Sequence, residues 1–300
     1  MTDAINLRKL LARKPIVVAP GVYDALSAHL AEQTGFSTLY VSGAGIAYTR
    51  LGRPDIGLVA MNEVADTVAM IRDRVSVHLV VDADNGYGNA LNVSRTTRLF
   101  ERAGANAIQL EDQVFPKRCG HLDNKTLISA DEMVGKVKAA LDARHSRETL
   151  VVARTDAIAV EGFEQAVARA VSYREAGADI LFVEAPKTHA ELQRIPIAIK
   201  DVPLMANMVE GGKTPSLAAA DLEAIGFSLV IFPGGIVRAV ARLASEFYAS
   251  LAAHGTSEPF RDRMYDFVTL NDVIGTPQLI ALGKEYYEAA TPNKKKGHGT

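Results

Sequence analysis

The chain alternates short apolar runs with longer amphipathic segments. The short runs are rich in Val and Ile and lack the polar–apolar alternation of a strand with one face in water. Continuous apolar strands are typical of a parallel sheet that is covered on both faces. We therefore predict eight strands, at residues 16–19, 38–42, 78–82, 107–111, 150–154, 180–184, 204–207 and 229–232.

The segments between these runs place apolar residues at helical spacing. They predict helices that include residues 63–74, 93–103, 131–144, 163–176 and 217–225. Several of the segments end at a glycine directly before the next strand, a position that suits a left-handed C-cap. These glycines are Gly35, Gly104, Gly177 and Gly226.

Eight strand–helix units within about 250 residues predict an α/β fold of the (β/α)₈ barrel type. The rival is an open doubly wound sheet, but no Gly-x-Gly-x-x-Gly follows the first strand. We expect one barrel domain over residues 1–300, with a C-terminal helical extension at 236–290 and a flexible tail at 291–300. The extension comprises predicted helices at 236–254, 258–270 and 277–289, whose simplest use is contact within an oligomer.

Composition excludes several other classes of protein. The 300 residues are 48% hydrophobic and 23% charged, which is typical of a globular chain. The net charge of -2 gives no electrostatic footprint for nucleic acid or an anionic membrane, so we expect neither partner. Cys119 is the only cysteine, which excludes an intrachain disulfide and a Cys-rich zinc site. A single thiol and a start without a secretory signal favour a cytoplasmic location.

Polar residues follow the predicted strands where a barrel places its chemistry, at the carboxyl ends. For one Asp alone, a helix cap or a structural ion pair is the more common explanation. Convergent polar groups at six strand ends favour a functional site, because buried charges need partners. The residues are Ser42, Asp82 with Asp84, Glu111 with Asp112, Arg154 with Asp156, Glu184 and Asn207.

Asp82, Asp84 and Glu111 come from neighbouring strand ends and offer only oxygen ligands. Mg²⁺ prefers oxygen and usually keeps several waters, so it needs only one or two direct carboxylates. An Asp-x-Asp pair alone is a weak signal, but its place after a buried strand strengthens it. We expect these three residues to hold Mg²⁺, with Mn²⁺ as an alternative.

A second cluster is Lys117-Arg118-Cys119-Gly120-His121, within the long gap between residues 112 and 129. Such a gap in a compact barrel is typical of a functional lid. Two cations before Cys119 and His121 after it favour the thiolate, so Cys119 is a candidate nucleophile or general acid–base. The alternative, an inert small hydrophobe, prefers a buried strand or helix to a charged loop.

Two further segments give weaker signals. Ser42, Gly43 and Ala44 follow the second predicted strand, where backbone N–H groups could face an anion, although turns use the same residues. The polar, Gly-rich segment 207–214 follows the seventh predicted strand and lacks the full spacing of a phosphate-binding loop.

Taken together, these motifs resemble the isocitrate lyase/phosphoenolpyruvate mutase superfamily along nearly the whole chain. The matching stretches are residues 19–24, 41–45, 82–88, 111–113, 117–121, 152–156 and 206–215. The resemblance implies a barrel whose eighth helix is exchanged with a neighbouring subunit, and a homotetramer. It also implies Mg²⁺ holding an α-keto or α-hydroxy acid at the strand ends.

Within the superfamily, the Lys-Arg-Cys-Gly-His loop resembles that of carbon–carbon bond lyases. Residues 206–215 look like the 2,3-dimethylmalate lyase branch, and Val209 stands where methylisocitrate and isocitrate lyases usually place a hydroxyl residue. We expect a Mg²⁺-dependent lyase that cleaves a 2-hydroxy dicarboxylate of the alkylmalate type into an α-keto acid and a carboxylate. The alternatives are a 2-methylisocitrate lyase acting on a tricarboxylate, an oxaloacetate hydrolase or decarboxylase, and an idle metabolite-binding barrel.

The resemblance also implies roles for individual residues. Cys119 would protonate the leaving carbon with His121 and Lys117 tuning it, and Arg154 would stabilise the developing oxyanion. After the eighth strand, residues 233–235 add room without charge, and Arg238, on the helix that follows, is expected to point toward the barrel wall or a neighbouring subunit. Room without donors suits an alkyl group. The substrate-binding residues would be Tyr40, Ser42, Gly43, Ala44, Asp55, Gly120, Arg154, Glu184, Asn207 and Pro233.

Overall fold

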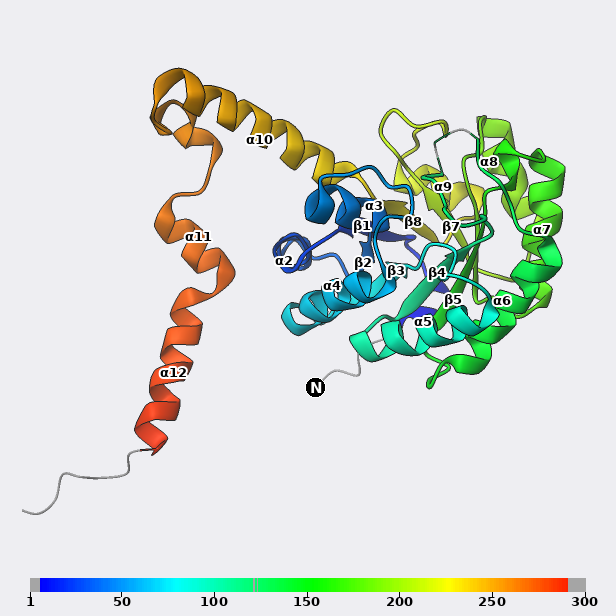
Figure 1. Ribbon diagram of the computed structural model, residues 1–300, viewed down its shortest axis with the longest axis horizontal. Coiled ribbons are helices and arrows are strands. Elements are labelled where there is room, and N and C mark those ends of the chain that lie inside the picture. Colours follow the sequence, from blue (N-terminus) through cyan, green and yellow to red (C-terminus); the bar gives the residue numbers. More distant parts are fainter. Residues whose placement is uncertain (1–5, 121, 123, 291–300) are drawn as a thin grey trace, which may run out of the picture. The chain divides into compact units, whose positions relative to one another are not determined.

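A computed structural model describes residues 6–120, 122 and 124–290 of the chain. Eight parallel strands form a closed barrel in which each strand pairs with the next and β8 pairs with β1 (Figure 1). The strands are β1 (Val17–Val22), β2 (Thr38–Val41), β3 (His78–Asp82), β4 (Ala107–Glu111), β5 (Leu150–Thr155), β6 (Ile180–Val183), β7 (Leu204–Asn207) and β8 (Leu229–Phe232). The predicted barrel is confirmed, and the closing β1–β8 pair excludes the open sheet.

Helices surround the barrel and connect consecutive strands (Figure 1). They are α1 (Leu7–Leu11), α2 (Ala25–Gln33), α3 (Gly43–Ile46), the π-helical η1 (Ala47–Leu51), α4 (Met61–Arg74), α5 (Ala90–Ala103), α6 (Ala130–Ala143), the 3₁₀ turn η2 (Ala157–Ala159), α7 (Phe163–Glu175), α8 (His189–Ala198) and α9 (Ala219–Ile225). The bounds of the five helices predicted between the strands, which are α4, α5, α6, α7 and α9 of the structure, agree with the predicted segments to within three residues.

Helix α5 shows how the sequence specifies these units. The side chain of Asn89 accepts hydrogen bonds from the backbone N–H groups of Leu91 and Asn92 and so caps the helix N-terminus. Its buried residues recur at helical spacing from Val93 to Phe100, which turns one face toward the strands. Gly104 ends the helix with φ 107°, the left-handed C-cap that the sequence predicts.

Side chains that alternate along the strands fill two separate cores. In β5, Leu150 and Val152 pack inside the barrel, whereas Val151 and Ala153 pack between the barrel and the helices. Leu7 and Leu11 of α1 join the inner core beside the first residues of β5 and β8. Helix α1 therefore covers the N-terminal end of the barrel, and the opposite end remains for the site.

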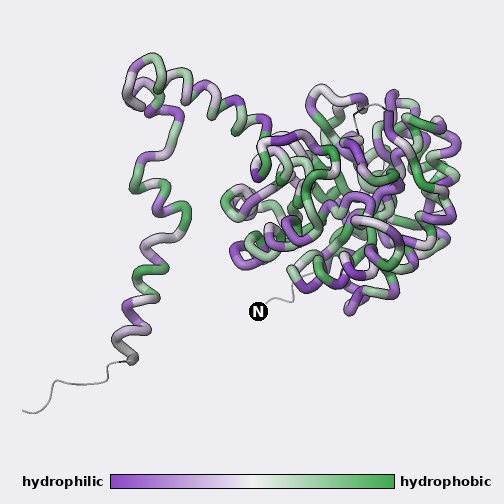
Figure 2. The backbone as a smooth tube through the Cα atoms, in the orientation of Figure 1, coloured by the Kyte–Doolittle hydropathy of each residue, from purple (hydrophilic) through white to green (hydrophobic). Residues whose placement is uncertain are grey.

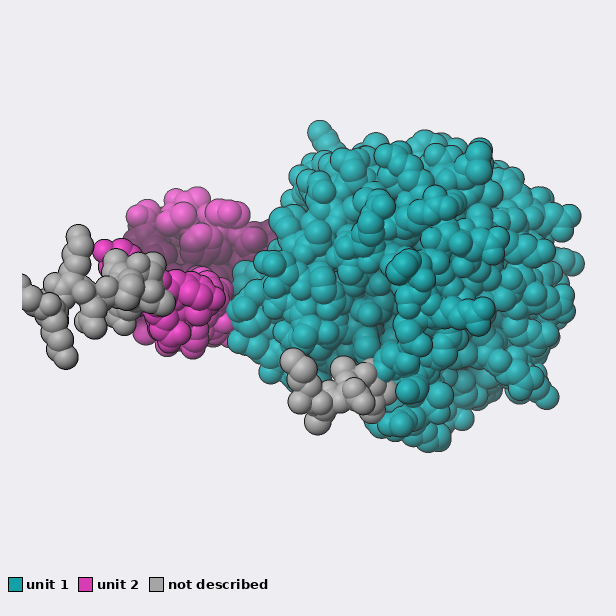
Figure 3. Space-filling model, turned by 90° about the horizontal axis from the view of Figure 1, so that it is seen from below, with its two compact units in different colours: residues 1–239 teal, residues 240–300 magenta. Residues whose placement is uncertain are grey.

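The chain divides into two compact units, residues 1–239 and 240–300 (Figure 3). Helix α10 (Gly235–His254) crosses the boundary, and it is followed by η3 (Glu258–Arg263), α11 (Phe267–Ile274) and α12 (Thr276–Ala290). The predicted single helix over 258–270 is wrong, because Asp266 caps a new helix by accepting from the backbone N–H of Thr269 at 2.7 Å. The predicted tail at 291–300 lies outside the described residues.

Apolar and polar residues alternate along α11 and α12 (Figure 2). Large apolar side chains are exposed on both helices, among them Phe267 at 84% and Tyr287 at 73%. None of the described helices is long and apolar enough to cross a membrane.

Candidate active site

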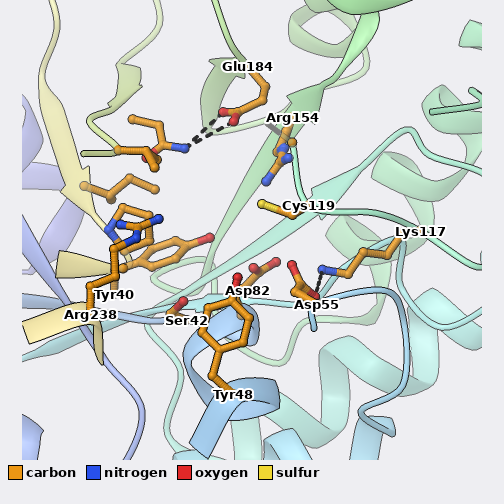
Figure 4. A pocket seen from close by; sticks show the side chains of 17 residues that line it. Tyr40, Ser42, Tyr48, Asp55, Asp82, Lys117, Cys119, Arg154, Glu184 and Arg238 are labelled. Atoms are coloured by element: carbon orange, nitrogen blue, oxygen red, sulfur yellow. Dashed lines mark hydrogen bonds and ion pairs between the residues drawn. The ribbon is translucent and has the colours of Figure 1, made fainter. Parts of the chain in front are cut away.

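A cavity opens at the carboxyl ends of the barrel strands (Figure 4). It brings together most of the residues that the sequence singles out, from strands that lie far apart in the chain. Of these it is lined by Tyr40, Ser42, Ala44, Asp55, Asp82, Lys117, Cys119, Gly120, Arg154, Glu184, Asn207 and Pro233. Gly43, Asp84 and Glu111 lie outside this lining, and His121 is outside the described residues.

Lys117 lies among four buried carboxylates, Asp55, Asp82, Asp84 and Glu111, which we call the acidic group. Its ammonium nitrogen Nζ lies 2.6 Å from Asp55 Oδ1 and 2.6 Å from Asp84 Oδ1. Burial raises the pKa of Asp84 to about 7, with Asp82 and Asp55 adding to the rise and Lys117 opposing it. Asp84 also has φ 47°, a left-handed conformation that non-glycine residues rarely adopt and that is found at functional sites.

Arg154 forms ion pairs with two buried carboxylates, those of Asp156 and Glu111. Its guanidinium donates to Asp156 from Nε at 3.0 Å and from Nη2 at 3.1 Å, and Nη1 lies 3.4 Å from Glu111 Oε2. It also stands over the Phe182 ring, 5.2 Å from its centroid. Two fixed carboxylates and a ring face hold the guanidinium in one orientation.

The predicted cation triad is not preformed. Within residues 6–120, 122 and 124–290, no three His, Cys, Asp or Glu side chains form a group that could hold a metal ion. The physical reason is that Lys117 pairs with Asp84 while Arg154 pairs with Glu111. The sequence could not show that these cations compete for the same carboxylates.

The donor set nevertheless fits a divalent cation. Asp55, Asp82, Asp84 and Glu111 are all buried, and only Lys117 and Arg154 oppose them within this group. Among the described atoms, Glu111 Oε1 is buried without a hydrogen-bond partner. An excess of buried carboxylate oxygen with an unused acceptor suits a hard cation such as Mg²⁺.

Cys119 points into the cavity from the segment between β4 and α6, between Arg154 and Lys117 (Figure 4). Its backbone N–H donates to the carbonyl oxygen of Asp55 at 3.2 Å. The neighbouring Gly120 packs so closely that a Cβ at this position would collide with Arg154 and Glu184. This packing holds the Cys119 segment beside the Arg154 guanidinium, which also lines the cavity.

Glu184 and Asn207 lie beside each other at the ends of β6 and β7. The amide Nδ2 of Asn207 donates to both carboxylate oxygens of Glu184 at 3.2 Å (Figure 4). Asp112, at the end of β4, instead accepts from Thr155 and Tyr173 behind the cavity and is structural. Asp112 therefore has the structural role that is more common for a single Asp at a strand end.

Five further residues line the cavity that are not among the catalytic, metal-binding or substrate-binding residues expected from the sequence. Four of them are Tyr48, Val209, Ile231 and Gly234. The fifth is Arg238, and the expectation that it points away is wrong. Helix α10 begins directly at the end of β8, so its first turn lies at the cavity, where Arg238 Nη1 donates to Glu210 at 2.6 Å. A cation in the first helical turn after a barrel strand was the available signal.

The chain matches the family model described as phosphoenolpyruvate phosphomutase over residues 7–252. It therefore belongs to this family, within the phosphoenolpyruvate mutase/isocitrate lyase superfamily, whose enzymes are metal-dependent.

Two relatives with assigned activities match most of the chain. It is 41% identical to 2,3-dimethylmalate lyase of Eubacterium barkeri over 286 residues, covering 95% of this chain and 99% of that one. It is 47% identical to 2-methylisocitrate lyase of Aeropyrum pernix over 269 residues, covering 90% and 86%.

Three solved structures share the fold at more than 25% identity. A crystal structure of 2,3-dimethylmalate lyase has a TM-score of 0.88 at 36% identity and covers 98% of this chain and 97% of its own. Oxaloacetate acetylhydrolase with 3,3-difluorooxalacetate has a TM-score of 0.87 at 32% identity, with 94% and 96% covered. Phosphonopyruvate hydrolase with oxalate and Mg²⁺ has a TM-score of 0.83 at 30% identity, with 94% and 98% covered.

The packing of Gly120 gives a stability prediction. Gly120→Ala is expected to lower the free energy of unfolding by about 1–3 kcal/mol, because the added methyl group must displace Arg154 or Glu184. Gly135→Ala is the matched control: a Cβ at that position in α6 meets no atom within 4 Å, and alanine favours a helix by up to about 1 kcal/mol. Urea unfolding measures both. A Gly120→Ala variant as stable as the parent chain contradicts this packing.

Proposed function

We propose that this protein is a metal-dependent carbon–carbon lyase that cleaves a 2-hydroxy dicarboxylate of the alkylmalate type into an α-keto acid and a carboxylate. The observation that carries the proposal is the placement of Cys119 and Arg154 on one cavity with Ser42 and Asp82. A thiol beside a fixed guanidinium offers an acid and an oxyanion partner at one carbon–carbon bond. The match to 2,3-dimethylmalate lyase over 95% of this chain supports the choice of substrate class.

Asp82, Asp84 and Glu111 would hold the metal, with Asp55 and Lys117 adjusting the charge around them. Bound there, Mg²⁺ would supply Lewis acidity to the substrate carboxylate and 2-hydroxyl. Lys117 pairs with Asp55 and Asp84 and so offsets part of the cost of burying these carboxylates. Ser42 and Ala44 face the keto-acid half of the substrate.

Bond cleavage begins when the 2-hydroxyl loses its proton to a general base at the cavity. The electron pair of that O–H bond forms the C2 carbonyl, the C2–C3 bond breaks, and its electrons pass to C3 as an enediolate. Arg154 stabilises the oxyanion of this group, because its guanidinium is already oriented by Asp156. The thiol of Cys119 gives its proton to C3, and the resulting thiolate is reprotonated by an equivalent of the proton released from the 2-hydroxyl, so that no net proton is consumed. Gly120 keeps the thiol close to the reacting carbon, and Lys117 and His121 would tune it.

The remaining wall of the cavity suits an alkyl group. Val209, Ile231 and Pro233 offer apolar surface to the part of the substrate beyond C3. Arg238 is the one additional cation in the described lining, and it is already paired with Glu210. Glu184, Asn207 and Tyr40 would position the substrate from the other side.

A second candidate is 2-methylisocitrate cleavage. Arg238 favours it, because a guanidinium on the cavity could receive a third carboxylate if Glu210 released it. The 47% identity to a 2-methylisocitrate lyase supports the same alternative.

The assembly and location remain parts of the proposal. The exposed apolar side chains of α11 and α12 support a homotetramer with the exchange of helices that the superfamily resemblance implies. Light scattering at micromolar concentration measures the mass, and a monomer contradicts this assembly. The single thiol supports a cytoplasmic location.

Substrate preference tests the proposed function directly. 2-Alkylmalates and 2,3-dialkylmalates are expected to show higher kcat/KM than isocitrate or 2-methylisocitrate. The reason is that the Val209 side chain offers no hydrogen-bond donor to a third carboxylate. Several alkylmalates should be accepted, because one buried methylene discriminates by only about 1–3 kcal/mol. Keto-acid release is measured for each substrate side by side, with oxaloacetate included. A clear preference for 2-methylisocitrate assigns the second candidate instead.

Metal removal tests the role of the acidic group. Activity is expected to vanish after exhaustive chelation and to return with Mg²⁺ or Mn²⁺, because the donors are carboxylate oxygens. Turnover is assayed together with elemental analysis of the protein. Full activity in a preparation that contains no metal contradicts the assignment.

The acid role of Cys119 predicts a selective loss. Cys119→Ala should lower kcat by roughly 10²–10⁴-fold, the usual contribution of a general acid, while keto-acid binding is retained through Arg154. Cys119→Ser is the matched variant, with similar size but a far weaker acid, and should be impaired as well. Steady-state kinetics and calorimetric titration with the keto acid separate the two effects. Turnover like that of the parent chain in either variant removes Cys119 from the mechanism.

A further inference from the structure

Lys125 is a buried cation behind the cavity wall, in the same interstrand segment as Cys119. Its side chain is 1% exposed, and it does not line the cavity. The ammonium donates to Asp156 Oδ1 at 2.8 Å and also to the carbonyl oxygen of Gly120. One side chain therefore connects the end of β5 to the residue that follows the proposed acid.

Asp156 accepts hydrogen bonds from two cationic side chains, Arg154 and Lys125. Its carboxylate is 0% exposed. Burial alone would raise the pKa of Asp156, but Arg154 and Lys125 together hold it well below its usual range. A carboxylate that is shared in this way fixes the two cations relative to each other.

Asp156 is itself anchored from behind. Its backbone N–H donates to Asp112 Oδ1 at 2.9 Å, and the hydroxyl of the preceding Thr155 donates to Asp112 Oδ2 at 2.7 Å. Tyr173 adds a third donor to the same carboxylate at 2.8 Å. The position of Asp156 is thus set by three elements of the barrel, independently of the Cys119 segment.

A buried ammonium is a costly way to fill space. Taking a charge out of water is offset only by well-formed pairs, and apolar side chains of the same volume often stabilise as well or better. The advantage of a lysine here is geometric: it bonds the segment at Gly120 and the strand at Asp156 at once.

We propose that Lys125 is a positioning residue that fixes the Cys119 thiol relative to the Arg154 guanidinium. Lys125 and Arg154 share Asp156, while Gly120 packs directly against Arg154. A further anchor of the segment is the bond from the Cys119 backbone N–H to the Asp55 carbonyl oxygen. Lys117 adds its ion pairs with Asp55 and Asp84. The catalytic consequence rests on the proposed function, because it requires Cys119 to be the acid.

The kinetic test uses Lys125→Met, which keeps the length of the side chain and removes its donors. With 2,3-dimethylmalate as substrate, kcat is expected to fall about 10–100-fold, since a shift of about 1 Å between reacting groups costs up to about 10²-fold. KM should change less than about threefold, because Lys125 does not touch the substrate. Lys138→Met, an exposed lysine on α6, is the matched control and should leave both constants unchanged.

A double-mutant cycle separates positioning from general damage. If Lys125 acts through Cys119, Lys125→Met should lower the residual kcat of Cys119→Ala by less than about threefold. Losses that multiply in the double variant overturn the proposal, because they show that Lys125 acts independently of the thiol. Lys125→Gln, which keeps one donor, carries the same comparison if the Met variant does not fold.

Amide hydrogen exchange tests the tether without any substrate. In Lys125→Met, the backbone N–H of Cys119 should exchange at least about tenfold faster, whereas Lys138→Met should leave its rate unchanged. Unchanged exchange at Cys119 overturns the tether. If the parent chain cleaves none of the dicarboxylates but the exchange result holds, the proposed function fails and the tether stands.

Discussion

The ion pair between Arg154 and Asp156 is the interaction on which the geometry of the site depends. It is buried, it is bidentate, and the backbone N–H of Asp156 donates to Asp112, which fixes the residue to the barrel. Such a pair is expensive to bury and is tolerated only where its geometry is well satisfied. Arg154 pairs with Glu111 on one side and packs against Gly120 on the other. The same ion pair therefore influences the position of a carboxylate of the acidic group and of the segment that carries Cys119.

The acidic group has the opposite character, because its charges are not balanced. Asp55, Asp82, Asp84 and Glu111 gather at strand ends around Lys117 and Arg154, and burial raises the pKa of both Asp84 and Glu111. Unbalanced buried charge lowers stability, and it is retained where a ligand supplies the missing charge. The cavity therefore has the fully paired Arg154 on one side and the acidic group around Lys117 on the other, with Cys119 between them.

The strands and the larger helices of the barrel could be predicted from the sequence, because the strands are covered on both faces and their residues are predominantly apolar. Gly104 indicated the C-terminal end of α5, whereas the helix begins three residues before the predicted start at 93, because Asn89 caps it there. Lys125 could not be assigned, because its partner Asp156 is distant in the chain and meets it only in the folded barrel. Arg238 had a signal in its place on the first turn after β8, but its pairing with Glu210 is likewise set only by the fold. The competition of Lys117 for Asp84 was hidden for the same reason.

The central claim is that the Cys119 thiol protonates the carbon released by C2–C3 cleavage. The most direct measurement is turnover of 2,3-dimethylmalate in D₂O, with mass spectrometry and chiral analysis of the carboxylate product. The account predicts propionate with one deuterium at C2 and a single configuration, since one fixed acid delivers the label to one face. Propionate labelled equally on both faces, or no release of pyruvate, would contradict it.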